Sequence, residues 1–158
     1  MSPLVWIANI VAWPVIHLSV AAAFLRMPLE RFEGDNWLTA PRRWERQGQF
    51  YRDYFAIRAW KRLLPDGAPW LSGFAKKNLS RRDAAYLTEF LQETRRAELA
   101  HWCMLGSLPV FFLWNPPWAC WVMTLYALVA NLPCIVAQRY NRLVLARITA
   151  PRGCWLAR

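Results

Sequence analysis

Charged residues are scarce in this chain of 158 residues, and long stretches lack them altogether. Only 19% of the residues are Asp, Glu, Lys or Arg, whereas 56% are apolar. Residues 1–25 contain no charged residue, and residues 97–138 contain only one, Glu98. An ordinary soluble domain carries about 25% charged residues. The many large apolar side chains exclude a disordered chain, and the uncharged stretches predict an all-α integral membrane protein.

Several signatures of chemistry are missing as well. The sequence contains no Gly-rich phosphate loop, no nucleophile elbow and no paired acidic metal motif. Its four cysteines lack the paired spacing of a zinc site or a redox couple. The sequence pattern alone therefore leaves two interpretations, a membrane enzyme or a membrane scaffold.

Three apolar stretches are candidate membrane spans, since a bilayer core of about 30 Å takes about 20 helical residues. Residues 3–25 and 118–138 are long enough, and residues 99–114 form a shorter candidate before the break Asn115-Pro116-Pro117. Residues 3–25 lack the basic start of a cleaved signal peptide, so we expect them to remain as a span. We expect a single membrane domain over residues 1–158.

The basic residues that flank the spans predict their orientation. They are Arg26 and Arg31 after the first span, Arg95 and Arg96 before the second, and Arg139 and Arg142 after the third. The positive-inside rule makes these flanks cytoplasmic. We therefore expect a multi-pass protein of the cell membrane with its N-terminus outside, a cytoplasmic amphipathic region at 26–98 and a cytoplasmic basic tail at 139–158.

The middle region is expected to hold two amphipathic helices. Residues 41–64 interleave aromatic and basic side chains and end at Pro65-Asp66-Gly67, which stops a helix. Beside three spans, this pattern indicates a helix in the lipid headgroup layer rather than nucleic-acid binding. The second helix is expected to start at Ser80, where Ser80-Arg81-Arg82-Asp83 has the pattern of a capping box.

The apolar stripe of the second helix turns polar at Thr94, Glu98 and His101. Glu98 and His101 are three residues apart, so they share a helical face on which the carboxylate would orient the imidazole as a general base. A structural polar pair at the helix junction is an equally simple interpretation. A metal site is less favoured, because di-iron bundles use Glu-x-x-His twice and this chain has it once.

A second polar face lies in the last apolar stretch. Asn131, Gln138 and Arg142 are spaced by seven and four residues, with Tyr140 and Asn141 close by. An amide at this depth either bridges helices or binds an acyl carbonyl or a phosphate.

Several strings of this sequence are similar to those of a known family. They are Arg26-Met27-Pro28 with Phe32, Trp44 through Phe50, Phe55 through Gly67 and, most sharply, Glu93 through Trp102 and Tyr126 through Arg142. Over most of its length the chain resembles the glycosyl-4,4'-diaponeurosporenoate acyltransferase family. These small membrane proteins attach a fatty acyl group to a sugar in staphyloxanthin-type carotenoid synthesis.

The resemblance implies transfer of an acyl group from an acyl-CoA-like thioester, with no tightly bound cofactor, to a sugar hydroxyl of a glycosylated carotenoid or related glycolipid. His101, oriented by Glu98, would take the hydroxyl proton, and Asn131 or Gln138 would donate to the oxyanion. Arg95, Arg96, Arg139 and Arg142 would hold the donor phosphates. The other residues expected to bind substrate are Glu93, Thr94, Trp102, Tyr140, Asn141, Arg58, Trp60 and Lys61.

A non-enzymatic scaffold or accessory subunit that binds anionic lipid is the alternative function. Transport is a third, but three short spans offer too few helices for a pathway unless the protein forms a homo-oligomer.

Overall fold

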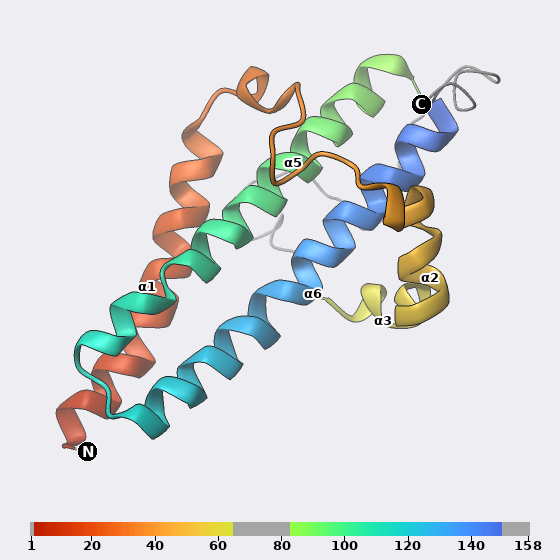
Figure 1. Cartoon of the computed structure of the whole chain (residues 1–158). Coiled ribbons are helices and arrows are strands. Elements are labelled where there is room, and N and C mark those ends of the chain that lie inside the picture. Colours follow the sequence, from red (N-terminus) through yellow and green to blue (C-terminus); the bar gives the residue numbers. More distant parts are fainter. Residues whose placement is uncertain (1, 65–82, 150–158) are drawn as a thin grey trace.

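The computed structural model describes residues 2–64 and 83–149, and every regular element in those residues is a helix (Figure 1). The expected all-helical class is therefore confirmed for this part of the chain. The long helices are α1 (Pro3–Arg26), α5 (Ala84–Gly106) and α6 (Pro117–Thr149). The short α-helices are α2 (Gln49–Phe55) and α3 (Ile57–Trp60), and the 3₁₀ helices are η1 (Leu29–Phe32), η2 (Arg43–Gly48), η3 (Lys61–Leu63) and η4 (Leu108–Leu113).

The long helices run antiparallel in chain order, so the start of α1 and the α5–α6 connection lie at the same end of the molecule. At this end Asn9 of α1 and Asn115 exchange amide hydrogen bonds of 2.7 and 2.9 Å. Next to them Trp13 stacks on Phe111, with ring centroids 4.3 Å apart, and both side chains are buried. α1 is thus fixed to the turn that precedes α6 by both polar and aromatic contacts.

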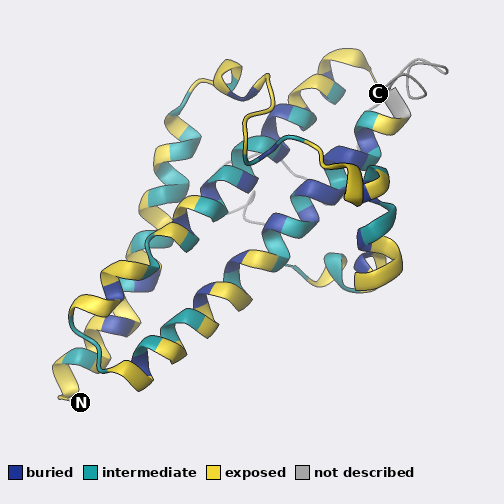
Figure 2. Cartoon of the chain, viewed as in Figure 1, coloured by how far each residue is buried: buried dark blue, intermediate teal, exposed yellow. Residues whose placement is uncertain are grey.

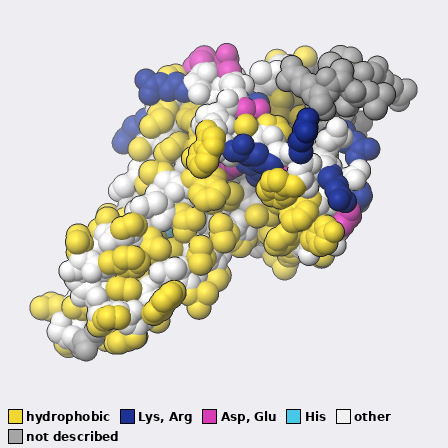
Figure 3. Space-filling model, viewed as in Figure 1, with side chains coloured by type: hydrophobic (Ala, Val, Ile, Leu, Met, Phe, Trp, Pro, Cys, Tyr) yellow, Lys and Arg dark blue, Asp and Glu magenta, His cyan; other side chains and the backbone are white. Residues whose placement is uncertain are grey.

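Two helices in the described residues, α1 and Pro117–Arg147 of α6, are long and apolar enough to cross a membrane. Only 11% and 22% of their most apolar windows are buried inside the described part of the protein, whereas the core helix of a soluble protein is mostly buried. Figure 3 shows apolar side chains covering the end of the molecule that holds the N-terminus, while the charged side chains gather toward the other end. This division is compatible with membrane association.

The expected third span at 99–114 is not a separate helix. Residues 99–106 are the last part of α5, which begins at Ala84, and Leu108–Leu113 form η4 with Pro109 near its start. Ser107 closes α5, because its backbone N–H bonds to Cys103 and Met104 in a tight last turn. The last stretch, in contrast, extends further than expected: α6 does not stop at residue 138 but includes the start of the predicted tail, whose residues 150–158 lie outside the described residues.

The prediction of a single amphipathic helix over residues 41–64 is also wrong. Arg46, Gln47, Gly48 and Ala56 have positive φ angles, which interrupt a right-handed helix and divide this segment into η2, α2, α3 and η3. These bends wrap the segment around the second half of α6, where buried Tyr51 and Ile57 pack with Tyr140 and Leu143. The predicted stop at Pro65-Asp66-Gly67 lies outside the described residues.

α5 begins after Asp83 rather than after Ser80. Asp83 has extended backbone angles and its carboxylate accepts a 3.0 Å hydrogen bond from the Tyr86 N–H, so it is the N-cap and not the fourth residue of a capping box. Ser80-Arg81-Arg82 lie outside the described residues.

α5 and α6 bury polar as well as apolar side chains against each other, mostly in the half of the molecule away from the N-terminus (Figure 2). Tyr86 and Phe90 of α5 pack with Leu145 of α6 in an apolar cluster. Further along the same interface, Glu98 and Asn131 are fully buried. Apolar packing therefore gives way to a polar cluster between these two helices.

The close approach of the segment around Gly48 to α6 can be tested by substitution of this glycine. Its φ is +90°, and a Cβ atom there would lie 3.3 Å from Tyr140 Cδ2 and 3.4 Å from Val144 Cγ2. Gly48→Ala is expected to lower the free energy of unfolding by about 1–2 kcal/mol through backbone strain and crowding, measured by equilibrium unfolding in mixed micelles. Gly34→Ala is the matched control, because a Cβ at Gly34 meets nothing within 4 Å. Equal stability of the two variants would contradict the described approach.

Candidate active site

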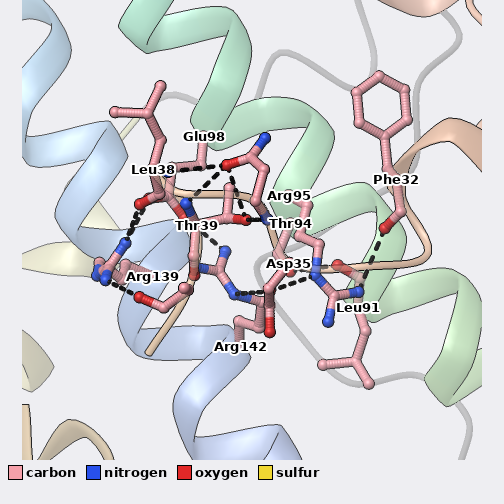
Figure 4. Close-up of polar contacts among 12 residues, drawn as sticks. Phe32, Asp35, Leu38, Thr39, Leu91, Thr94, Arg95, Glu98, Arg139 and Arg142 are labelled. Atoms are coloured by element: carbon pink, nitrogen blue, oxygen red, sulfur yellow. Dashed lines mark hydrogen bonds and ion pairs between the residues drawn. The ribbon is translucent and has the colours of Figure 1, made fainter. Parts of the chain in front are cut away.

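Glu98 bridges two arginines of α6 at the centre of the polar cluster (Figure 4). Its Oε1 accepts a 2.9 Å hydrogen bond from Arg139 Nη1, and its Oε2 accepts a 2.5 Å bond from Arg142 Nη1. Arg139 and Arg142 are three residues apart on α6, so both guanidinium groups reach the same carboxylate. Glu98 is 0% exposed and the arginines are 7% and 2% exposed, which makes this a buried ion cluster.

Glu45 of η2 brings a second buried carboxylate to Arg139. Its Oε1 pairs with Arg139 Nε, and its Oε2 accepts a 3.1 Å bond from Nη2. The Tyr51 hydroxyl donates to Glu45 Oε1 at 2.6 Å. Burial raises the pKa of Tyr51 above its ordinary value, and the hydrogen bond to Glu45 raises it further, so this hydroxyl keeps its proton.

Backbone carbonyls of residues 38–40 complete the cluster. Arg139 donates to the carbonyl oxygens of Leu38 and Ala40, both at 2.6 Å, and Arg142 donates to that of Thr39 at 2.7 Å. Two carboxylates and two guanidinium groups balance in charge, and the carbonyls take up further N–H donors. The buried charges are thus paired, as burial requires, and within the described cluster only Arg142 Nε lacks a hydrogen bond.

His101 pairs with Asn131 across the α5–α6 interface. Its Nδ1 lies 3.0 Å from Asn131 Oδ1, while Asn131 Nδ2 donates to the Ala127 carbonyl at 2.9 Å. Because the amide nitrogen bonds within its own helix, the amide oxygen faces the histidine and Nδ1 carries the hydrogen. A neutral imidazole in this tautomer has its lone pair on Nε2, which suits a general base.

The remaining arginines expected at the site are also paired. Arg95 donates to Asp35 at 2.7 Å and to the Phe32 carbonyl at 3.2 Å, and Arg96 pairs with buried Glu93. Thr94, also buried, donates to the Leu91 carbonyl at 2.7 Å.

A separate group lies near the end of α6, where Tyr140 and Asn141 meet α3 and η3. Arg58 Nε donates to the Tyr140 hydroxyl at 3.2 Å, and Lys61 Nζ donates to Asn141 Oδ1 at 2.8 Å while lying 5.0 Å from the Tyr140 ring centroid. Trp60 donates to the Phe55 carbonyl at 2.7 Å. Burial, then the charges of Arg58 and Arg62, lower the pKa of the Lys61 ammonium.

Comparison with known proteins identifies the family. Residues 34–150 match the family model described as glycosyl-4,4'-diaponeurosporenoate acyltransferase. Proteins of that name from Staphylococcus aureus strains bovine RF122 / ET3-1 and USA300 are each 31% identical over 146 residues, which cover 89% of this chain and 87% of theirs. The chain belongs to this acyltransferase family. A relative from strain Newman is 30% identical over 132 residues, 82% of this chain and 79% of its own.

Family membership confirms the resemblance seen in the sequence and makes this chain an acyltransferase, which favours the enzyme over the scaffold alternative. No solved structure matches the chain. In the part of this acyltransferase that the structure describes, no group of three or more His, Cys, Asp and Glu side chains is placed to hold a metal ion.

The structure corrects one expected contact of this acyltransferase. Glu98 does not orient His101, because its oxygens bind Arg139 and Arg142 and His101 bonds to Asn131 instead. Two cationic guanidinium groups are stronger partners for a carboxylate than a neutral imidazole. The Asn131 amide uses one of its two N–H groups on the Ala127 carbonyl, so its expected role as an oxyanion donor stays a prediction.

The four arginines expected to hold donor phosphates are each paired with a carboxylate. Arg139 and Arg142 are enclosed in the cluster, so a phosphate would have to displace a buried carboxylate to bind them. Arg95 and Arg96 lie nearer the surface, and phosphate binding there stays a prediction. The carboxylates involved are Asp35, Glu45, Glu93 and Glu98, of which Asp35 and Glu45 were missed as site residues.

Among the expected site residues, Arg142 has a buried Nε without a hydrogen bond in the described residues, although Asp35 Oδ1 lies 3.9 Å away. Two further residues hold such atoms. Trp102 Nε1 and Gln138 Oε1 have no hydrogen-bond partner in the described residues. Since buried polar atoms are nearly always bonded, substrate binding by these two residues stays a prediction that fits their free bonding capacity.

Glu98 is expected to act through stability rather than chemistry. Glu98→Gln removes the charge that bridges Arg139 and Arg142, and breaking a buried ion pair costs about 3–5 kcal/mol, so the free energy of unfolding in mixed micelles should fall by that order. Glu89→Gln removes the same charge from an exposed position on the same helix and should change stability little. A Glu98→Gln protein as stable as the Glu89→Gln control would contradict this role.

Proposed function

We propose that this protein transfers a fatty acyl group from an acyl thioester to a sugar hydroxyl of a glycosylated carotenoid or a related glycolipid in the cell membrane. The names of its relatives support the acceptor class. The observation that carries the chemistry is the His101–Asn131 pair, an imidazole held in one tautomer at a helix interface beside an apolar outer surface.

The membrane placement rests on the distribution of exposed side chains. Large exposed apolar residues occupy α1 from Leu4 to Leu18, η4, and α6 from Trp118 to Leu132. The rise along α6 from Pro117 to Arg139 is about 33 Å, close to the thickness of a bilayer core. We therefore place the buried ion cluster at one membrane boundary, and the positive-inside rule makes that boundary cytoplasmic. The apolar end of α5 and η4 would then lie within the apolar layer between α1 and α6.

His101 lies one helical turn beyond Glu98 toward the apolar end, about 5 Å along α5. A sugar attached to a lipid stays at the interface, and an acyl chain enters the apolar layer. The position of His101 suits a reaction that joins these two groups.

The proposed reaction uses His101 as general base. Nε2 accepts the proton of the sugar hydroxyl while the hydroxyl oxygen attacks the thioester carbonyl carbon, and Asn131 Oδ1 stabilises the resulting imidazolium through Nδ1–H. The new C–O bond gives a tetrahedral intermediate. Its C–S bond then breaks, the carbonyl re-forms, and the leaving thiolate takes the proton back from His101.

Trp102 and Gln138 are proposed to complete the substrate contacts. The Trp102 indole N–H is a donor without a partner in the described residues, which suits the oxyanion of the intermediate, and Gln138 Oε1 is an acceptor that suits the sugar hydroxyl. Substrate would thus satisfy both buried atoms.

The test compares acyl transfer by purified full-length variants, measured by mass spectrometry of the acylated glycolipid. His101→Gln is expected to lower kcat by about 100-fold or more, the usual contribution of a general base. Asn131→Ala should lower kcat less, and Asn131→Asp, which keeps the acceptor oxygen, should recover part of the loss. The unfolding midpoint of each variant separates lost chemistry from lost structure.

His17→Gln is the matched control. His17 lies in α1 and its ring nitrogen contacts the Trp13 carbonyl of its own helix at 2.9 Å. We expect it to keep full activity. Full activity of a folded His101→Gln protein would exclude the proposed base.

A further inference from the structure

The segment that wraps around the second half of α6 carries more positive than negative charge. Residues 42–64 contain seven Lys and Arg residues but only two acidic residues, Glu45 and Asp53. Glu45 is taken up by the buried cluster, and Asp53 pairs with Arg52 at 3.2 Å. Within the described residues, this leaves six of the seven cations without a carboxylate for their side chains, and Arg58, Lys61 and Arg62 are among them.

Two of these cations converge on the same pair of neutral side chains. Arg58 of α3 donates to the Tyr140 hydroxyl, and Lys61 of η3 donates to the Asn141 amide oxygen. These partners lie 82 and 80 positions further along the chain. Arg58 is exposed and Lys61 is half-buried. The two charges are three positions apart in the consecutive segments α3 and η3, and the fold brings both of them to the same part of α6.

This group has more donors than acceptors. Arg58 and Lys61 each use one N–H on a protein oxygen, which leaves several N–H groups. Tyr140 accepts from Arg58 and keeps its own O–H as a donor, and Asn141 accepts from Lys61 through its oxygen and keeps its amide N–H₂. Donors of this number around two cations match the several acceptor oxygens of a phosphate.

The lowered pKa of Lys61 also favours an anion at this position. Its pKa is lowered by burial and by Arg58 and Arg62, so the folded protein holds its ammonium in an unfavourable position. An anion bound among these side chains would remove that penalty. Arg95, Arg96, Arg139 and Arg142 differ in this respect, because a carboxylate of the protein already neutralises each of them.

We propose that Arg58, Lys61, Tyr140 and Asn141 form a binding site for a phosphate group. Two sources have the right chemistry: the phosphates of a CoA-like acyl donor and the headgroup of an anionic phospholipid. Only the first source rests on the proposed function. The proposal of a phosphate site rests on the two cations, Arg58 and Lys61, that have no carboxylate partner in the described residues.

The experiment measures binding rather than turnover. One arm titrates purified full-length protein in neutral detergent with coenzyme A, and the other measures retention of phosphatidylglycerol against phosphatidylcholine from nanodiscs by native mass spectrometry. The double variant R58Q/K61Q is expected to weaken phosphate binding by about 100-fold, about tenfold for each charge-assisted contact. Tyr140→Phe, which removes the hydroxyl that donates to the phosphate and accepts from Arg58 but leaves both charges, should weaken it less.

Arg52→Gln is the matched control, since it removes the same charge from the same segment at a residue that is paired with Asp53. We expect less than about a twofold effect, because a surface ion pair contributes little. Weakened coenzyme A binding in R58Q/K61Q identifies the donor as the source, and weakened phosphatidylglycerol retention alone identifies the headgroup. Unchanged binding in both arms, or an equal loss in Arg52→Gln, would overturn the site and leave the separate His101 experiment unaffected.

Discussion

The arrangement of this protein depends on one carboxylate that holds two arginines. Glu98 binds Arg139 with one oxygen and Arg142 with the other, and so fixes both the rotation and the register of α5 against α6. Through Arg139 the same contact reaches Glu45 and the carbonyls of Leu38 and Ala40, which draws the segment between α1 and α2 onto the helix pair. His101 lies one turn from Glu98, so its approach to Asn131 follows from this register.

A buried ion cluster is costly to desolvate, and an apolar core of the same volume is often as stable. In the proposed membrane environment, apolar packing would specify the helix register less well, because outward-facing apolar side chains are solvated by lipid as well as by another helix. On α6, exposed Trp121, Leu125 and Val129 precede the buried Arg139 and Arg142. The paired charges are satisfied in only one register of α5 against α6, whereas apolar packing allows several registers. Charge pairing can therefore select one of them.

The sequence predicted which residues form helices better than it predicted which side chains contact each other between the helices. Uncharged stretches indicated the helices. A spacing of three residues placed Glu98 with His101 on one face, and a spacing of seven placed Asn131 with Gln138 on another. Spacing describes one helix and says nothing of which side chain lies across from it, so the Glu98 pairing was wrong. Glu45 lies 94 positions from its partner Arg139. The breaks at Arg46, Gln47 and Ala56 carried no signal, because none of them is a glycine.

The two proposed sites constrain the donor. Asn141 and Asn131 are ten residues apart on α6, about 15 Å along the helix. A donor with its phosphate at Asn141 and its reacting carbonyl at His101 must span that distance with a long flexible arm. In a phospholipid the phosphate and the ester carbonyl are separated by only a few bonds, so a phospholipid that binds at Asn141 could not present its own acyl group to His101. A CoA-like thioester has the required arm, and the proposed path would run along α6 from Asn141 to Asn131, the residue that binds His101.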